Sequence, residues 1–184
     1  MPQIAIVLYP GYTALDLIGP YEVLRMLPKA QIRFVWHEPG PVVADSGVLL
    51  IGATHTFEET PSPDIVLVPG GPGFAEAARD KELRRWLQNV HATTTWTVSV
   101  CTGSIILAAA GLLEQRPATS HWAGISALKL HGALPVTDQR IVPAGEDSRI
   151  VTAAGVSAGI DAALWLAEQL AGPERAEAIA LAIE

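Results

Sequence analysis

The stretch "TWTVSVCTGSIILAAAGLL", residues 95–113, joins two different patterns around the only cysteine of the chain. The β-rich, apolar run that ends at residue 100 predicts a buried strand. The small and apolar residues 102–113 predict a helix that is covered on all sides. Cys101 therefore lies where a strand turns sharply into a helix. Such a turn, known as a nucleophile elbow, holds a side chain out at the rim of a sheet on a strained backbone.

Strand-like and helix-like segments alternate along the rest of the chain. Because the strand-like segments are almost continuously apolar, they predict an α/β fold: a mostly parallel sheet with helices on both faces, as in a flavodoxin-like sandwich. We expect a kink or restart at Gly19-Pro20, an N-cap at Thr13 and two pieces within residues 74–92. The expected strands are 3–11, 31–38, 47–52, 64–71, 94–100 and the hairpin of 140–142 with 149–155; the expected helices are 13–27, 74–92, 102–113, 157–172 and 173–184.

Composition narrows the class of protein. The 184 residues suit one domain, 1–184, whose last helix has no C-terminal signal and is expected to be truncated. The net charge of −7 and the lack of a basic cluster beyond "ELRRW" (82–86) argue against nucleic acid as a partner. One cysteine allows neither an internal disulfide nor a cysteine-rich metal site and fits the reducing cytoplasm. No apolar run is long enough to cross a membrane.

Three strand ends are expected to meet at the ligand-binding edge of the sheet: 9–11, 69–73 and 101–102. A lone cysteine is often just a small buried apolar residue. At the start of a helix, however, the free N–H groups favour a thiolate and should lower the thiol pKa. We therefore expect Cys101 to be a nucleophile.

The diglycine Gly70-Gly71 follows a predicted buried strand. It is either a simple turn or, together with the N–H of Thr102, a set of donors that stabilises an anion on a substrate bound at sulfur. Thr102 either starts the helix or offers its hydroxyl to the substrate.

Asp16 lies in the otherwise apolar stretch "ALDLIG" (14–19). An isolated aspartate near a helix start usually caps the helix or faces solvent. Near Cys101, burial and thiolate repulsion would instead raise its pKa and let it carry a proton at neutral pH. Glu22 is the competing carboxylate.

The expected pocket is lined by His121, Trp122 and Gly19. For His121 the alternative is a ring held by a backbone carbonyl, and for Trp122 the alternative is a place in the core.

These segments together resemble the ThiJ/PfpI superfamily, which is related to class I glutamine amidotransferases. The resemblance covers nearly the whole chain and implies that superfamily's fold, a homodimer, a small-molecule substrate and no metal or organic cofactor. It depends on "LDLIGPYEVL" (15–24), "DIVLVPGG" (64–71), "VCTGSIILAAAGLL" (100–113), "ATSHW" (118–122) and "VTAAGVSAGIDAALWL" (151–166).

Within this superfamily, the Asp…Cys-Thr combination is most similar to the isonitrile hydratases. The similarity implies that Asp16, Cys101 and Thr102 are catalytic, that Gly70 and Gly71 form the oxyanion site, and that an isonitrile becomes a formamide through a thioimidate on sulfur. Thr102 stands where the peptidase branch has histidine. Two alternatives stay open: a glyoxalase or deglycase using the same site, and a non-enzymatic ligand- or redox-sensing domain like those of AraC-type regulators.

Overall fold

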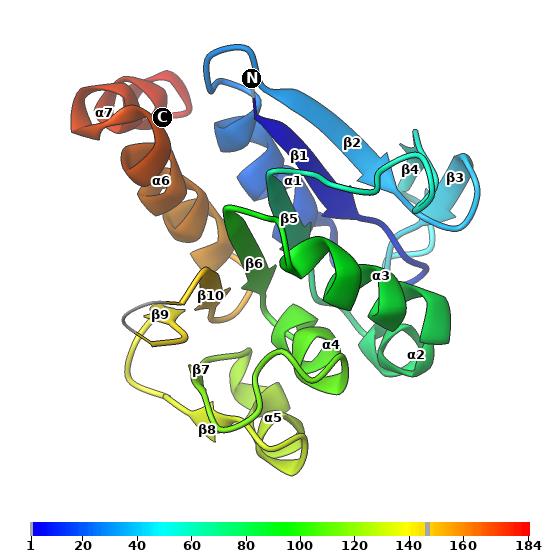
Figure 1. The fold of residues 1–184 in the computed structure, drawn as a ribbon. Helices are drawn as coiled ribbons and strands as arrows, with labels where there is room; N and C mark the ends of the chain where they lie inside the picture. The colour runs from blue at the N-terminus through cyan, green and yellow to red at the C-terminus, as the bar shows by residue number, and fades with distance from the viewer. Residues whose placement is uncertain (1, 146–147) are drawn as a thin grey trace.

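A computed structural model describes residues 2–145 and 148–184 and has a six-stranded sheet at its centre (Figure 1). All neighbouring strands are parallel except β9, which runs antiparallel to β10. The expected mostly parallel α/β sheet is confirmed. In order across the sheet, the strands are β2 (Gln31–Val35), β1 (Gln3–Val7), β5 (Ile65–Val68), β6 (Trp96–Val100), β10 (Ile150–Ala153) and β9 (Ile141–Pro143).

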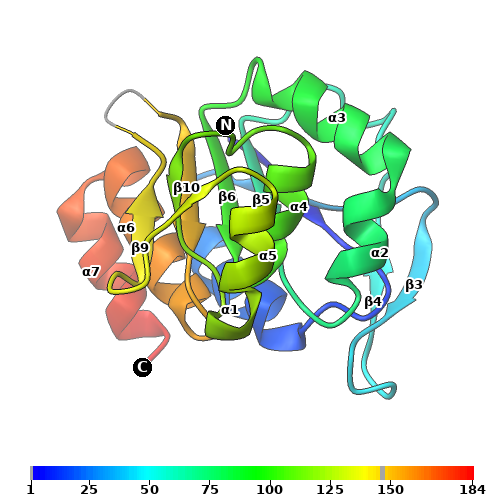
Figure 2. The ribbon, with the colours of Figure 1, turned by 90° about the horizontal axis from the view of Figure 1, so that it is seen from below.

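Helices cover both faces of this sheet. Helices α1 and α6 lie together against one face, whereas α3 and α4 cover the other, as the two views show (Figures 1 and 2). This double cover explains why strands β5 and β10 are buried along their whole length. The helices are α1 (Ala14–Leu24), α2 (Phe74–Arg79), α3 (Lys81–His91), α4 (Gly103–Ala109), α5 (Ile125–Leu130), α6 (Ala158–Ala171), α7 (Pro173–Ala182) and the 3₁₀ turn η1 (Trp122–Gly124).

The strand register brings the expected strand ends to one edge. Val68 at the end of β5 pairs with Ser99 of β6, and Val100 at the end of β6 pairs with Ala153 of β10. Strand β1 lies between β2 and β5, so the chain order reverses there. Open α/β sheets bind ligands at such a reversal, outside the carboxyl ends of the strands.

Local details differ from the sequence-based expectation. Helix α1 runs through Pro20 without a restart, and Thr13, although at the N-cap, donates its hydroxyl to Asp45 (2.7 Å) instead of capping the helix. Helix α4 ends at Ala109, earlier than expected, because the chain turns at Gly111 with φ of 78°. The two expected pieces of 74–92 are confirmed as α2 and α3, and the hairpin is confirmed as β9 and β10; part of its turn, 146–147, lies outside the described residues.

Several short elements had not been expected. Strand β3 pairs with β4, the β4 strand itself begins three residues later than predicted, and two two-residue strands pair with each other. The bounds are β3 (Gly40–Val43), β4 (Leu50–Ala53), β7 (Pro117–Ala118) and β8 (Leu134–Pro135).

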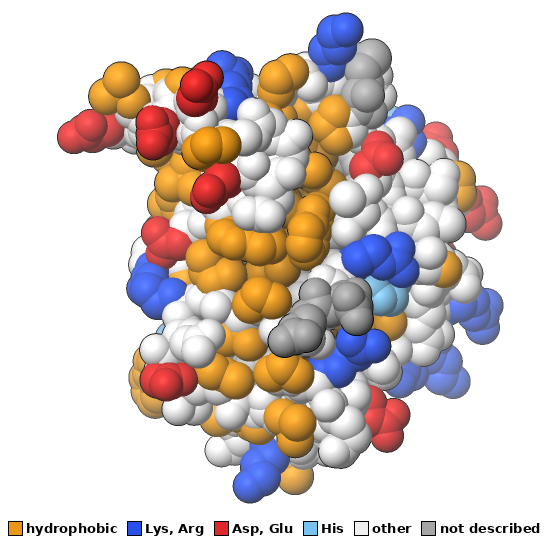
Figure 3. Space-filling view, turned by 60° about the vertical axis from the view of Figure 1, so that its left-hand side comes forward, with side chains coloured by type: hydrophobic (Ala, Val, Ile, Leu, Met, Phe, Trp, Pro, Cys, Tyr) orange, Lys and Arg blue, Asp and Glu red, His pale blue; other side chains and the backbone are white. Residues whose placement is uncertain are grey.

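The face that carries α6 has many hydrophobic side chains on its surface (Figure 3). Within this part of the structure, Trp165 of α6 packs edge to face on Trp96 of β6, with the ring centres 5.1 Å apart. Within the described ranges, no helix has the length and hydrophobicity to span a bilayer.

Candidate active site

Cys101 stands on a strained turn between β6 and α4. Its φ of 57° lies in the left-handed region that residues other than glycine rarely adopt. Four hydrogen bonds hold the turn: the Cys101 amide donates to the carbonyls of Ala153 (3.1 Å) and Ala154 (2.8 Å), and its carbonyl accepts from the hydroxyls of Ser104 (3.2 Å) and Ser120 (3.0 Å). Strain of this kind persists only where the surroundings fix it. The sharp turn predicted from the sequence is therefore present at the carboxyl edge of the sheet.

Glycines let the neighbouring segments approach this turn. A Cβ atom on Gly103 would collide with the carbonyl oxygen of Val68, and one on Gly70 would lie 2.5 Å from the amide nitrogen of Thr102. Strands β5 and β6 and the start of α4 therefore meet more closely than residues with side chains would allow.

Asp16 in the first turn of α1 is completely buried. Its Oδ2 accepts the amide of Gly70 (3.0 Å), whereas its Oδ1 has no hydrogen-bond partner among the described residues. Burial raises the pKa of Asp16 to about 6, against the lowering effect of hydrogen bonds from the Cys101 side chain and from Gly70. The side chain of the competing Glu22 is 43% exposed and pairs with Arg25 (2.6 Å). Asp16 is the carboxylate beside Cys101.

The thiol itself behaves differently from the expectation. Burial and the negative charge of Asp16 raise the pKa of Cys101 to about 11, although hydrogen bonds from the backbone N–H groups of Val156 and Thr102 act in the other direction. The predicted lowering was wrong because burial of the thiol and the charge of the neighbouring carboxylate outweigh the backbone N–H groups around the sulfur. The proton of the pair therefore resides on sulfur at neutral pH.

The two glycines after β5 are engaged inside the protein. The amide of Gly70 donates to Asp16, and the amide of Gly71 donates to the Thr102 hydroxyl (3.0 Å), which in turn donates to the Gly71 carbonyl (3.3 Å). Neither glycine amide is free to receive an anion as the sequence had suggested. The donors beside the sulfur are instead the amides of Thr102 and Val156.

A small cavity of about 210 Å³ opens above the sulfur. His121 lines it, as expected, and accepts the Ala123 amide at Nδ1 (3.2 Å). Trp122 does not line it and is 82% exposed, so both its expected pocket place and the alternative core place are wrong. Gly19 is also elsewhere: a Cβ atom there would lie 2.8 Å from Ile160, so this glycine lets α1 pack on α6. The lining is Thr13, Gly71, Pro72, Phe74, Cys101, Thr102, His121 and Val156.

Sequence reasoning missed Phe74 and Val156. Val156 has φ of 28°, and its amide faces the sulfur from the segment before α6, 55 residues after Cys101 in the chain. The only local signal was the pair Gly155-Val156 just before the predicted helix 157–172.

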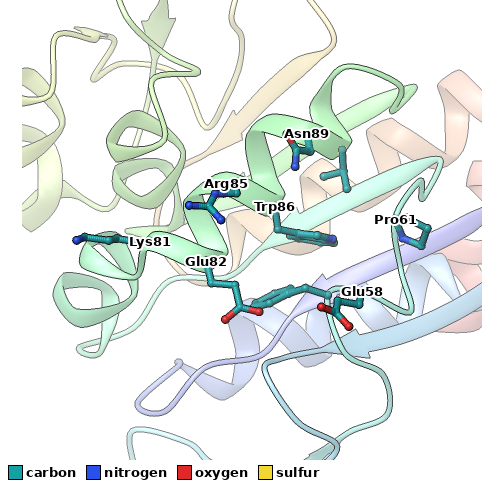
Figure 4. Close-up of a pocket in the computed structure, with 9 residues that line it drawn as sticks. Glu58, Pro61, Lys81, Glu82, Arg85, Trp86 and Asn89 are labelled. Carbon is teal, nitrogen blue, oxygen red and sulfur yellow. The ribbon is translucent and has the colours of Figure 1, made fainter.

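A larger hollow of about 570 Å³ lies elsewhere, beside α3 (Figure 4). Lys81, Glu82, Arg85 and Trp86 project from α3, and Glu58 lies across from them. This hollow shares no lining residue with the cavity at Cys101. Within residues 2–145 and 148–184, no group of three or more His, Cys, Asp or Glu side chains is arranged to hold a metal ion.

Known proteins share this architecture and much of this sequence. The isonitrile hydratase of Pseudomonas putida is 41% identical over 182 residues, which are 99% of this chain and 78% of that protein. The crystal structure of a ThiJ/PfpI family protein from Pseudomonas syringae superposes with a TM-score of 0.91 at 39% identity, covering 98% of this chain and 73% of that one.

A second kind of relative differs in size. The HTH-type transcriptional regulator CdhR of Pseudomonas aeruginosa is 30% identical over 175 residues, and this chain, covered to 92%, spans about half (51%) of that regulator. All of these similarities agree with the match of residues 2–169 to the DJ-1/PfpI family. With its fold, its cysteine turn and this match over most of its length, the chain belongs to the DJ-1/PfpI family.

Proposed function

We propose that the protein hydrates isonitriles to N-substituted formamides, with Cys101 as nucleophile and Asp16 as proton carrier. The observation that carries the proposal is the buried pair itself: a completely buried carboxyl with a raised pKa beside a cysteine on a strained turn, at the base of a small cavity. The 41% identity to an isonitrile hydratase over nearly the whole chain supports the choice of substrate.

The pair holds one proton when the site is empty. With a pKa of about 6 at Asp16 and about 11 at Cys101, the carboxyl is ionised and the thiol is protonated near pH 8. A carboxylate beside the S–H group takes its proton as the sulfur attacks.

The first half of the reaction forms the carbon–sulfur bond. The terminal carbon of R–N≡C gains the thiol proton, relayed by Asp16, and a bond to the sulfur of Cys101, which gives the thioimidate R–N=CH–S–Cys. The amides of Thr102 and Val156 stabilise negative charge on sulfur as its proton leaves.

The second half consumes water. Asp16 takes a proton from water as the water oxygen bonds to the thioimidate carbon, and passes that proton to the nitrogen, which becomes N–H. The carbon–sulfur bond then breaks, the sulfur regains its proton and R–NH–CHO leaves. The atoms of one isonitrile and one water are accounted for, and no electrons are exchanged with a cofactor.

Product analysis tests this directly. The protein is incubated with cyclohexyl isocyanide, and N-cyclohexylformamide is measured by mass spectrometry; Cys101→Ala serves as the inactive control. Lack of formamide, with turnover of methylglyoxal instead, would favour the glyoxalase alternative. Lack of turnover of both cyclohexyl isocyanide and methylglyoxal would favour the non-enzymatic sensing domain. The regulator CdhR, of which this chain spans about half, fits that alternative.

A further inference from the structure

The cavity above Cys101 is small for a ligand site. Pockets for drug-sized ligands usually have roughly 300–1,000 Å³, whereas this one has about 210 Å³. A dry apolar cavity of about 150 Å³ holds one benzene molecule. Since Cys101 at the base is only 5% exposed, the reacting carbon has to enter this space together with the first part of its substituent.

The polar groups of the lining are largely occupied by the protein. The Thr13 hydroxyl donates to Asp45, and the Thr102 hydroxyl is bonded to both the amide and the carbonyl of Gly71. Apart from Nε2 of His121, the side chains therefore offer mainly hydrocarbon to a substituent. A polar substituent would lose its water without gaining hydrogen bonds, which costs free energy.

Phe74 has the largest side chain of the lining and is firmly placed. Its amide donates to the Gly71 carbonyl (3.0 Å), and its ring packs against the core. The preceding Gly73 donates its amide to Gly11 (3.1 Å) and lies so close to Pro10 that a Cβ atom would collide with the Pro10 carbonyl.

His121 is equally restricted, because a Cβ atom on Gly155 would lie 2.7 Å from its Cδ2. The backbone of Gly155 therefore bounds the His121 ring on one side.

From this geometry we infer that Phe74 acts as a size filter, so that the enzyme takes isonitriles with apolar substituents up to about a six-carbon ring. The inference rests on the proposed isonitrile hydratase activity. Phe74 is a specificity-determining residue here, not a participant in proton transfer.

Two isonitriles and three variants test it. We expect the wild-type protein to hydrate cyclohexyl isocyanide with a higher kcat/KM than 2-naphthyl isocyanide, and Phe74→Ala to reduce this preference by about tenfold or more. Phe74→Leu should give a smaller change in the same direction and covers the case in which the alanine variant is poorly folded. Phe57→Leu, which alters a phenylalanine of the larger hollow, should leave the preference unchanged.

A second measurement does not depend on the proposed activity. Because Cys101 is the only cysteine, its alkylation by iodoacetamide and by N-(2-naphthyl)iodoacetamide is followed by the intact mass alone. The rate with iodoacetamide divided by the rate with N-(2-naphthyl)iodoacetamide should fall in the Phe74 variants and stay unchanged in Phe57→Leu. A shifted alkylation ratio without isonitrile turnover would reject the proposed function and keep the size filter. Unchanged ratios in folded Phe74→Ala and Phe74→Leu, or equal hydration of both isonitriles by the wild type, would overturn the filter.

Discussion

The cavity above Cys101 and the hollow beside α3 differ in chemistry more than in size. The smaller one, about 210 Å³, has a strained cysteine at its base and a completely buried carboxyl next to it. The larger one, about 570 Å³, is bordered by a regular helix that Asp80 caps with two hydrogen bonds of 2.9 Å. Volume alone would select the hollow beside α3, which has neither of these features.

The two sites differ in how their charged side chains are stabilised. In the larger hollow Glu82 is 60% exposed and bonds to His37 (3.0 Å), and Glu58, Lys81 and Arg85 are exposed to solvent, so that water and neighbours stabilise every charge. At the smaller site, Oδ1 of Asp16 is buried and has no partner among the described residues. A carboxylate in that situation holds a proton more tightly and moves it at neutral pH.

The largest expected effect is the loss of the nucleophile. Cys101→Ala should lower formamide production by a factor on the order of 10⁶, to below detection, since no other group forms the thioimidate. Lys81→Ala, a truncation at the larger hollow, should hydrate cyclohexyl isocyanide at the wild-type rate. Measured turnover in the Cys101 variant would break the assignment of chemistry to the smaller site.

Removing the proton carrier should cost less. Asp16→Asn is expected to lower kcat/KM by about 10²–10⁴-fold. In the wild type, kcat/KM should rise with pH through about 6, because the carboxylate must be ionised to accept the thiol proton.

The residual activity of Asp16→Asn should lack this rise, and Glu58→Gln, the same change at the larger hollow, should keep it. A wild-type profile that is flat between pH 5 and 8 would contradict the role of Asp16. Since the two groups interact, the observed pKa belongs to the pair.

Burial of Asp16 should also make the stability of the folded protein depend on pH. Its pKa rises from 3.8 in the unfolded chain to about 6 in the fold, so the folded protein binds the proton more tightly and loses stability as the pH rises from about 4 to 6. The difference of about two units corresponds to about 3 kcal/mol.

Relative to the wild type, Asp16→Asn should therefore be more stable at pH 8 than at pH 4 by about 2 kcal/mol in the free energy of unfolding, because the unfolded carboxyl is already partly ionised at pH 4. Denaturant titrations at both pH values measure it. Glu58→Gln should show no such difference, because Glu58 is exposed.

The central fold could be predicted because its inner strands are mostly apolar. The four parallel strands from β1 to β10 are covered on both faces, and their sequences show this without any partner being known. Strands β7 and β8 have two residues each, and α5 has six and packs on α4. Such short elements form through tertiary contacts that leave no periodic pattern.

Those features of the site that depend only on position along the chain could be predicted. The end of β6 placed Cys101 at the rim, and the apolar surroundings of Asp16 indicated its burial. The pKa of Cys101 depends on the distance to Asp16, and the contact of Val156 depends on the packing of a distant segment. No local pattern contains either quantity, which is why the direction of the thiol pKa was wrong.

The role of Thr102 gives the smallest effect and separates structure from chemistry. Its hydroxyl joins the turn at Cys101 to Gly71, so Thr102→Val leaves the buried Gly71 amide without a partner. We expect a loss of about 2 kcal/mol in the free energy of unfolding, within the range of about 1–3 kcal/mol for such a group. Thr102→Ser keeps the hydroxyl and should restore most of this stability. A valine variant as stable as the wild type but slower on cyclohexyl isocyanide would instead show that the hydroxyl serves the substrate.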